Sequence, residues 1–246
     1  MNKLYYTDTG QGSALVLLHS GGMTGEEWKP QLPTLAKHFR VIVPDQLGHG
    51  QSPMIADSLT IGDIGRAVIE LLDELAIDKA HLVGSSMGGA VALWLTINYP
   101  QCVEKLVLYR VGYRKNEATH GGAREMGDPK YWQSVGLAGW LSRIHESQGG
   151  ADAWQTVIKR VGDALNPETS DHAHDLETLQ RIVQPTLIVV GDRDSLVPLE
   201  HALAMFRAIP DAGLCVLPYA THVTATNTWR SDSFALEITR FLQRRS

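Results

Sequence analysis

The sequence is poor in cysteine, in excess positive charge and in long apolar runs. Cys102 and Cys215 are the only cysteines among 246 residues, so neither a disulfide framework nor a thiolate metal site is expected, and we predict two buried, inert thiols. A formal net charge of -5 at pH 7 argues against a nucleic-acid partner. No run approaches the roughly 18 apolar residues of a membrane span, and the N-terminus lacks an apolar signal segment. We therefore expect a cytoplasmic protein that does not bind membranes.

Short apolar runs alternate with longer amphipathic stretches, which is typical of strand and helix units wound into a mostly parallel sheet. Buried strands are expected at residues 14–18, 41–43, 82–83, 106–108, 186–190 and 214–217. Helices are expected over 61–76, from 87 to the proline at 100, and over 234–242. Thr60 is a suitable N-cap for the first of them. The pattern predicts one α/β domain with a doubly wound sheet.

The strand pattern is interrupted for about 75 residues, which is too long for a structureless loop in a compact domain. Within this stretch Asp128-Pro129 is a helix start signal, and two glycines at 149–150 separate further helices. We predict a helical cap over residues 110–185, inserted into a core of residues 1–109 and 186–246. The three cap tryptophans are each expected in the cap's own small core: Trp132, Trp140 and Trp154.

The strongest motif is the pentapeptide GSSMG at residues 84–88, between a strand pattern and a helix pattern. A G-x-S-x-G sequence in this setting forms a strained turn that exposes its central serine as a nucleophile. Ser86 would then lie at a helix N-terminus, whose dipole favours developing negative charge. Ser85 is not the central residue, because Val83 stands where the motif needs glycine. We predict Ser86 as the nucleophile.

A serine hydroxyl is a weak nucleophile near neutral pH, so it needs a general base, and the base needs an acid that orients it. Asp194 and His222 each follow a late predicted strand. The loops after parallel strands open on one edge of a sheet, which is also the edge of Ser86. The chain order Ser, Asp, His is that of α/β-hydrolases rather than of chymotrypsin or subtilisin. We predict His222 as the base and Asp194 as the acid.

A glycine-containing turn, LLHSGGM at residues 17–23, follows the first buried strand. Backbone N–H groups that converge in such a turn can bind an oxyanion, and the N–H of Met87, directly after the nucleophile, would be a second donor. We expect His19 in this turn to be a structural hydrogen-bonding residue. The polar run DHAHD at 171–175 lacks the i, i+4 spacing of helix-borne metal ligands, so we interpret it as a helix start capped by Ser170 and predict no metal site.

Together these segments resemble the α/β-hydrolase superfamily over nearly the whole chain: LLHSGG, DQLGHGQS (45–52), GSSMGG, PTLIVVGDRDSLVP (185–198) and the late His222. The resemblance implies a doubly wound, mostly parallel sheet with a small helical cap inserted after the sixth strand. It places the oxyanion donors on the backbones of Gly21 and Met87, makes Asp194 the acid with Asp192 a turn residue, and makes the loop from Asp45 structural. The chain departs from the family at two positions, with Ser20 and Thr221 where glycine is usual.

We therefore expect a serine hydrolase that needs no cofactor and cleaves a small ester or lactone through an acyl-enzyme intermediate. The resemblance leaves alternatives open: a carbon–carbon bond hydrolase of the meta-cleavage type, with a similar G-x-S-M-G-G turn, a thioesterase, a hydroxynitrile lyase or a perhydrolase. A protein that senses a ligand with very slow turnover is another alternative. The expected partner is a small-molecule substrate, and the expected assembly is a monomer or a homodimer.

Overall fold

A seven-stranded sheet forms the centre of the computed structural model, which describes residues 3–54, 59–114, 117–222 and 230–244. The strands are β1 (Tyr6–Thr9), β2 (Ala14–Leu18), β3 (Arg40–Pro44), β4 (Ala80–Ser85), β5 (Val103–Tyr109), β6 (Thr186–Gly191) and β7 (Ala212–Leu217). Their order in the sheet is β1-β3-β2-β4-β5-β6-β7, and every neighbouring pair is parallel except β1 with β3. All the strands expected from apolar runs are present, and the mostly parallel α/β fold is confirmed.

Two features of the sheet differ from expectation. Strand β1 has the sequence YTDT and lies at the edge of the sheet with three exposed side chains, so it carries no apolar run that would have predicted it. Within the described residues only β1 precedes β2, and the long helical insertion therefore follows the fifth strand rather than the sixth. The expected count was taken from the family resemblance, not from strand patterns in this chain.

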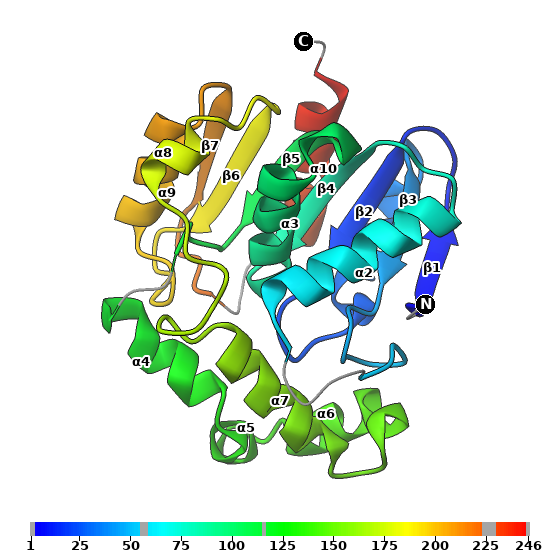
Figure 1. Cartoon of the computed structure of the whole chain (residues 1–246), viewed down its shortest axis with the longest axis vertical. Helices are drawn as coiled ribbons and strands as arrows, with labels where there is room; N and C mark the ends of the chain where they lie inside the picture. The colour runs from blue at the N-terminus through cyan, green and yellow to red at the C-terminus, as the bar shows by residue number, and fades with distance from the viewer. Residues whose placement is uncertain (1–2, 55–58, 115–116, 223–229, 245–246) are drawn as a thin grey trace.

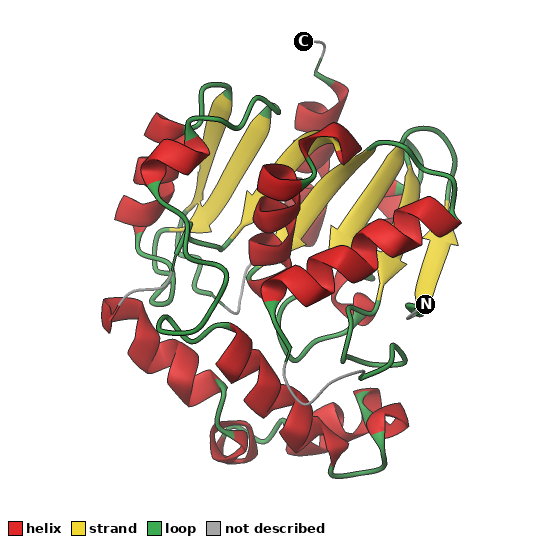
Figure 2. Ribbon diagram, in the orientation of Figure 1, coloured by secondary structure: helices red, strands yellow, loops and turns green. Residues whose placement is uncertain are grey.

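Helices cover both faces of the sheet (Figures 1 and 2). One face carries α2 (Ile61–Glu74), α3 (Met87–Asn98), α8 (Leu176–Leu179) and α9 (Leu199–Ala208), and the other carries α1 (Leu32–Leu35) and α10 (Ser231–Gln243). Short 3-10 helices lie at Gly25–Trp28, Pro100–Cys102 and Glu146–Gln148. Thr60 and Asp63 form a capping box at the start of α2, as the N-cap signal predicts.

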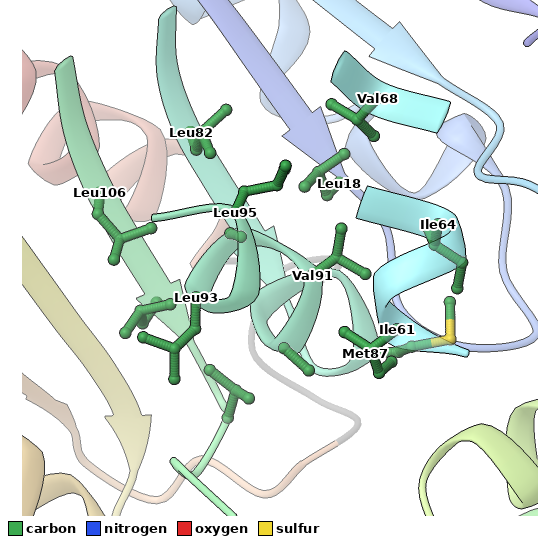
Figure 3. Packing of buried hydrophobic residues seen from close by; sticks show 14 of the residues in the cluster. Leu18, Ile61, Ile64, Val68, Leu82, Met87, Val91, Leu93, Leu95 and Leu106 are labelled. Atoms are coloured by element: carbon green, nitrogen blue, oxygen red, sulfur yellow. The ribbon is translucent and has the colours of Figure 1, made fainter. Parts of the chain in front are cut away.

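The alternation of side chains along each strand divides the core into two apolar layers. Leu15 and Leu17 of β2 pack toward α1 and α10, whereas Val16 and Leu18 pack toward α2 and α3. Figure 3 shows the second layer, in which Val91 and Leu95 of α3 lie among residues from the sheet and α2.

The two cysteines are less buried than predicted, since Cys102 and Cys215 are only partly buried. No helix in the described part of the chain is long and apolar enough to span a membrane.

Four helices between β5 and β6 lie beyond the carboxyl ends of the parallel strands (Figure 1). They are α4 (Glu117–Met126), α5 (Pro129–Ser134), α6 (Ala138–Ile144) and α7 (Ala153–Ala164). A small apolar cluster holds them together, formed by the buried residues Trp132, Leu141, Trp154 and Ile158 with Trp140 partly buried against them. The remaining helix of this stretch, α8, packs beside α9 on the sheet.

Candidate active site

Ser86 lies at the sharp turn between β4 and α3, with φ 52° and ψ -115°. This conformation is strained for a residue with a side chain, and such strain is typical of a nucleophile turn. The turn is possible only because the residues two positions before and after Ser86 are glycine. A Cβ atom on Gly84 would lie 2.2 Å from the carbonyl oxygen of Gly88, and one on Gly88 would lie 2.3 Å from the carbonyl oxygen of Leu18.

The structure brings the three residues expected to react into one hydrogen-bonded row. Ser86 Oγ lies 3.0 Å from Nε2 of His222, and Nδ1 of His222 lies 2.8 Å from Oδ2 of Asp194. His222 is 6% exposed, and the side chain of Asp194 is fully buried. With the proton on Nδ1 held by the carboxylate, Nε2 can accept the serine proton, which is the geometry that a general base requires.

Asp194 rather than Asp192 is the acid that reaches the histidine. Oδ1 of Asp194 accepts hydrogen bonds from the backbone N–H groups of Leu196 and Val197, both at 2.9 Å, so the carboxylate is held in place by its own loop. Asp192 is exposed and accepts from the backbone N–H of Ala220 at 3.2 Å. The two neighbouring aspartates therefore have the different positions that the resemblance implied.

The expected oxyanion donors also come together. A Cβ atom on Gly21 would lie 3.5 Å from Cβ of Met87, so the turn after β2 and the first residue of α3 are adjacent. Gly21 and Ser86 line the same cavity. A side chain at position 21 would also lie 2.5 Å from Cγ1 of Val161 in α7, so the turn fits closely under the helices of the insertion.

His19 and Asp45 act as structural supports of this edge of the sheet. His19 is fully buried, donates from Nδ1 to the carbonyl of Ser20 at 2.8 Å and accepts the backbone N–H of Gln46 at Nε2 at 2.9 Å. Burial lowers its pKa, which keeps it neutral and suits a residue that accepts a hydrogen bond. The carboxylate of Asp45 accepts the backbone N–H groups of Gly25 and Gln51 at 2.8 and 2.9 Å.

The run at 171–175 is also structural. Asp171 accepts the backbone N–H groups of Ile61 and Gly62 and so caps α2. The expected helix start at 171 is wrong: α8 begins at Leu176 with Asp175 as its N-cap, while Ser170 accepts the N–H of His172. The expectation failed because Asp171 caps a helix that is distant in sequence.

A cavity of about 110 Å³ opens beside Ser86 and His222. Its walls are formed by the following residues: Ser20, Gly21, Met23, Glu27, Arg110, Met126, Gly127, Trp132, Ile158, Val161, Gly162, Leu165 and Leu196. Trp132 therefore lines this cavity as well as belonging to the apolar cluster of the insertion. A nearly apolar cavity with a few convergent polar groups is the usual form of a small-molecule site.

Two charged residues of this wall were not expected from the sequence. Glu27 and Arg110 form a buried ion pair, with 2.6 Å between Nη2 and Oε1. One signal was present, because Arg110 directly follows the buried strand β5 at the same edge as Ser86. No signal in the sequence pairs it with Glu27, which lies 83 positions away.

The fold and this site define the chain as a member of the α/β-hydrolase family. Residues 13–130 match the family model of the alpha/beta hydrolase fold. A protein of Yersinia enterocolitica named "Putative carbamate hydrolase RutD" is 30% identical over an alignment of 262 positions, which covers 95% of this chain and 91% of the relative. The 2-hydroxy-6-oxo-6-phenylhexa-2,4-dienoate hydrolase of Burkholderia cepacia is also 30% identical, over 89% of this chain and 85% of the relative.

Solved structures show the same fold. A meta-cleavage product hydrolase from Pseudomonas fluorescens IP01 superposes with a TM-score of 0.82 at 22% identity and covers 97% of this chain and 93% of that one. The enol-lactonase of Burkholderia xenovorans LB400 has a TM-score of 0.78 at 24% identity, over 98% and 96% of the two chains. These structures show that the chain has the fold of this family, and the relatives at 30% identity support a hydrolase activity.

Proposed function

We propose that the protein is a serine hydrolase that cleaves a compact ester or lactone through an acyl-enzyme intermediate. The observation that carries this proposal is the row of Ser86, His222 and Asp194 at the wall of a small cavity, with 3.0 and 2.8 Å between the interacting atoms. A serine, a base and an acid in this arrangement are a recurring solution for acyl transfer.

In the proposed reaction Ser86 Oγ attacks the carbonyl carbon of the substrate while its proton passes to Nε2 of His222. The backbone N–H groups of Gly21 and Met87 stabilise the oxyanion that forms. His222 then gives the proton to the leaving alkoxide oxygen, and the C–O bond breaks to leave an acyl group on Ser86. A water molecule, deprotonated by His222, attacks this acyl group and releases the acid, and Ser86 regains its proton from His222.

The size of the cavity supports a compact substrate. Its volume of about 110 Å³ is well below the roughly 300–1,000 Å³ of sites that take drug-sized ligands. The residues that face it from α5 and α7 are apolar: Trp132, Ile158 and Val161. A short acyl group or a small lactone ring suits such a wall, and a charged acyl group does not.

A second candidate comes from the names of the relatives. Two proteins at 30% identity are named "Putative carbamate hydrolase RutD" and "2-hydroxy-6-oxo-6-phenylhexa-2,4-dienoate hydrolase". The substrate in the second name is a vinylogous diketone acid. A carbamate differs from an ester only in the nitrogen next to its carbonyl, so the same serine, base and oxyanion donors serve both. Carbon–carbon bond cleavage requires in addition that the substrate carbon be protonated before the bond breaks.

The test is a parallel assay of the purified protein with p-nitrophenyl acetate and butyrate, a γ- and a δ-lactone, a thioester, a carbamate and a vinylogous diketone acid, each also with Ser86→Ala. We expect turnover of roughly 1 to 1,000 per second on a short ester or a lactone, and none with Ser86→Ala. A single slow turnover would favour a ligand sensor. Cleavage of the diketone acid without ester hydrolysis would replace the proposal by the carbon–carbon alternative.

A further inference from the structure

A buried ion pair lies in the wall of the proposed site. Glu27 is in the 3-10 helix after β2, and Arg110 is the first residue after β5. Their side chains are 2% and 8% exposed, in contrast to the exposed or half-exposed ion pairs elsewhere in the described residues, such as Arg40 with Asp8. A buried pair of charges contributes little to stability compared with an apolar pair, so its position calls for another explanation.

The pair connects three segments of the site. Glu27 accepts the backbone N–H of Ser20 at 2.7 Å and the hydroxyl of Ser20 at 2.9 Å, in the turn that presents Gly21. Arg110 donates from Nη2 to the Ser20 hydroxyl at 2.8 Å and from Nε to the hydroxyl of Ser85, directly before the nucleophile, at 2.9 Å. Its Nη1 donates to the backbone carbonyl of His222.

The backbone of Arg110 is also unusual. Its φ of 46° lies in the left-handed region, which is unusual for a residue other than glycine, asparagine or aspartate. Such a conformation persists only where the surrounding contacts hold it in place. Strained conformations of this kind are concentrated at functional sites. Here the backbone N–H of Arg110 is held by the carbonyl of Val189 at 2.8 Å, and the guanidinium by the four acceptors above.

We propose that Glu27 and Arg110 act as a positioning pair, which fixes the direction of the Gly21 N–H and the position of His222 for the transition state. This inference rests on the proposed function. The Gly21 N–H belongs to the peptide group between Ser20 and Gly21, so the bonds from Glu27 to the N–H and the hydroxyl of Ser20 restrict rotation of the residue that carries this peptide group. Arg110 holds the loop of the base by donating a hydrogen bond to the backbone carbonyl of His222. A planar guanidinium fork can serve several acceptors at fixed angles, which a lysine ammonium cannot.

The pair also accounts for a departure from the family pattern. Ser20 occupies a position where glycine is usual, and its hydroxyl, like that of Ser85, contacts both members of the pair. The donors of Arg110 are directed to protein acceptors, which argues against a role as receptor for a substrate carboxylate. Neither residue touches the reacting atoms in the proposed mechanism.

The experiment compares Glu27→Gln, Arg110→Met and the double variant, which has no unpaired buried charge, with p-nitrophenyl acetate as substrate. We expect each single variant to lose about 100-fold in kcat, the order of a lost oxyanion donor, with KM changed less than threefold. We expect the double variant to lose about the same, because the two residues act as one unit. Arg40→Gln, which breaks the exposed pair with Asp8, is the matched control and should retain wild-type kcat.

Each other result overturns the proposal in a recognisable way. If the pair acted only by its charge, Glu27→Gln would raise kcat, Arg110→Met would lower it and the double variant would lie near wild type. If it were only structural, kcat measured at one temperature at which all the variants are fully folded would equal that of wild type. If Arg110 bound substrate, the loss would be in KM and confined to anionic esters. Recovery of kcat to within threefold by Arg110→Lys would exclude the fork geometry.

Two further measurements keep the test independent of folding and of the proposed function. If the single variants do not fold, Ser20→Ala removes one of the two hydroxyls that the pair shares without unpairing either charge. A loss in kcat of at least tenfold is expected, and a smaller loss would contradict the proposal. If the wild-type protein hydrolyses no ester, lactone, thioester or carbamate, the proposed function fails. If it does and the variants match it, only the positioning pair fails.

Discussion

The two sides of the cavity differ in chemistry. The side formed by the sheet and its loops contributes nearly all of the polar groups, among them Ser20, Ser86 and His222, whereas the residues from α4, α5 and α7 that line the cavity are apolar or glycine. In the proposed mechanism, bond making and breaking therefore depends on loops held by the sheet. We infer that discrimination between substrates depends on the helices above them.

The two regions also differ in what holds them. The sheet is enclosed by two extensive apolar layers. The helices of the insertion share one small cluster, and the end of α7 packs against one of the two layers through Ala164. A set of polar contacts joins the end of α6 to the loops of the sheet: His145 to Gly22 and Gly50, and Gln148 to the carbonyls of Gly50 and Ser52. Substitutions in the sheet loops should thus alter kcat. Substitutions in the helices should alter the selectivity between substrates or the attachment of the helices to the sheet loops.

The largest effect is expected at the nucleophile. Ser86→Ala removes the attacking oxygen, and comparable serines contribute on the order of a millionfold to kcat. The thermal unfolding midpoint should stay close to that of wild type, because the serine hydroxyl is not part of the apolar core. The measurement is kcat for the best ester beside a melting curve. Retention of more than about 1% of wild-type kcat would remove Ser86 from this role.

A smaller loss is expected at the acid. Asp194→Asn leaves the loop in place but favours the wrong tautomer of His222, and a loss of about ten-thousandfold in kcat follows. Asp192→Asn is the matched control two positions away, at an exposed residue that bonds to the backbone N–H of Ala220, and should change kcat little. The reverse outcome, with Asp192 the sensitive position, would show that the acid has been misassigned.

A feature of the fold or the site could be predicted from the sequence where the residues that determine it lie close together along the chain. Strands with apolar runs and the turn at Ser86 depend on residues close in sequence, so pattern alone placed them. Asp194 and His222 were also predictable, because each follows a parallel strand and such strand ends meet at one edge. Glu27 with Arg110, and Asp171 at the start of α2, are pairings between distant segments, and no local pattern records them. Polar β1 was missed because its partner, not its sequence, makes it a strand.

An intermediate effect tests the helical side of the cavity. Val161 reaches within 2.5 Å of the position that a Cβ on Gly21 would occupy. Val161→Ala should therefore enlarge the cavity and raise the ratio of kcat/KM for hexanoyl over acetyl p-nitrophenyl ester by about 10-fold, the low end of what one or two methylene groups contribute. Lys159→Ala, exposed on the same helix, should leave the ratio unchanged. In the wild type, faster hydrolysis of the palmitoyl than of the butyryl ester would mean that these helices do not limit the cavity.

The smallest effect concerns the attachment of those helices and depends on pH. His145 accepts the backbone N–H of Gly50 at Nδ1 and donates from Nε2 to the carbonyl of Gly22, an arrangement that only the neutral ring allows. Burial lowers the pKa of His145, so the unfolded chain takes up a proton near pH 6.5 while the folded chain does not. The contribution of His145 to the free energy of unfolding is therefore complete above that pH and falls as the pH decreases below it.

The expected slope is at most about 1.4 kcal/mol per pH unit for one histidine, and the fully buried His49, whose pKa burial lowers even further, adds its own share. His145→Gln should flatten the pH dependence of the unfolding free energy between about pH 5 and 6.5, whereas His38→Gln, at an exposed position, should not. Amide hydrogen exchange at pH 5.5 should be faster in α6 and α7 than in α3, after correction for intrinsic rates. Equal acceleration of exchange in all three helices would show that acid weakens the protein as a whole rather than the polar attachment of the helical side.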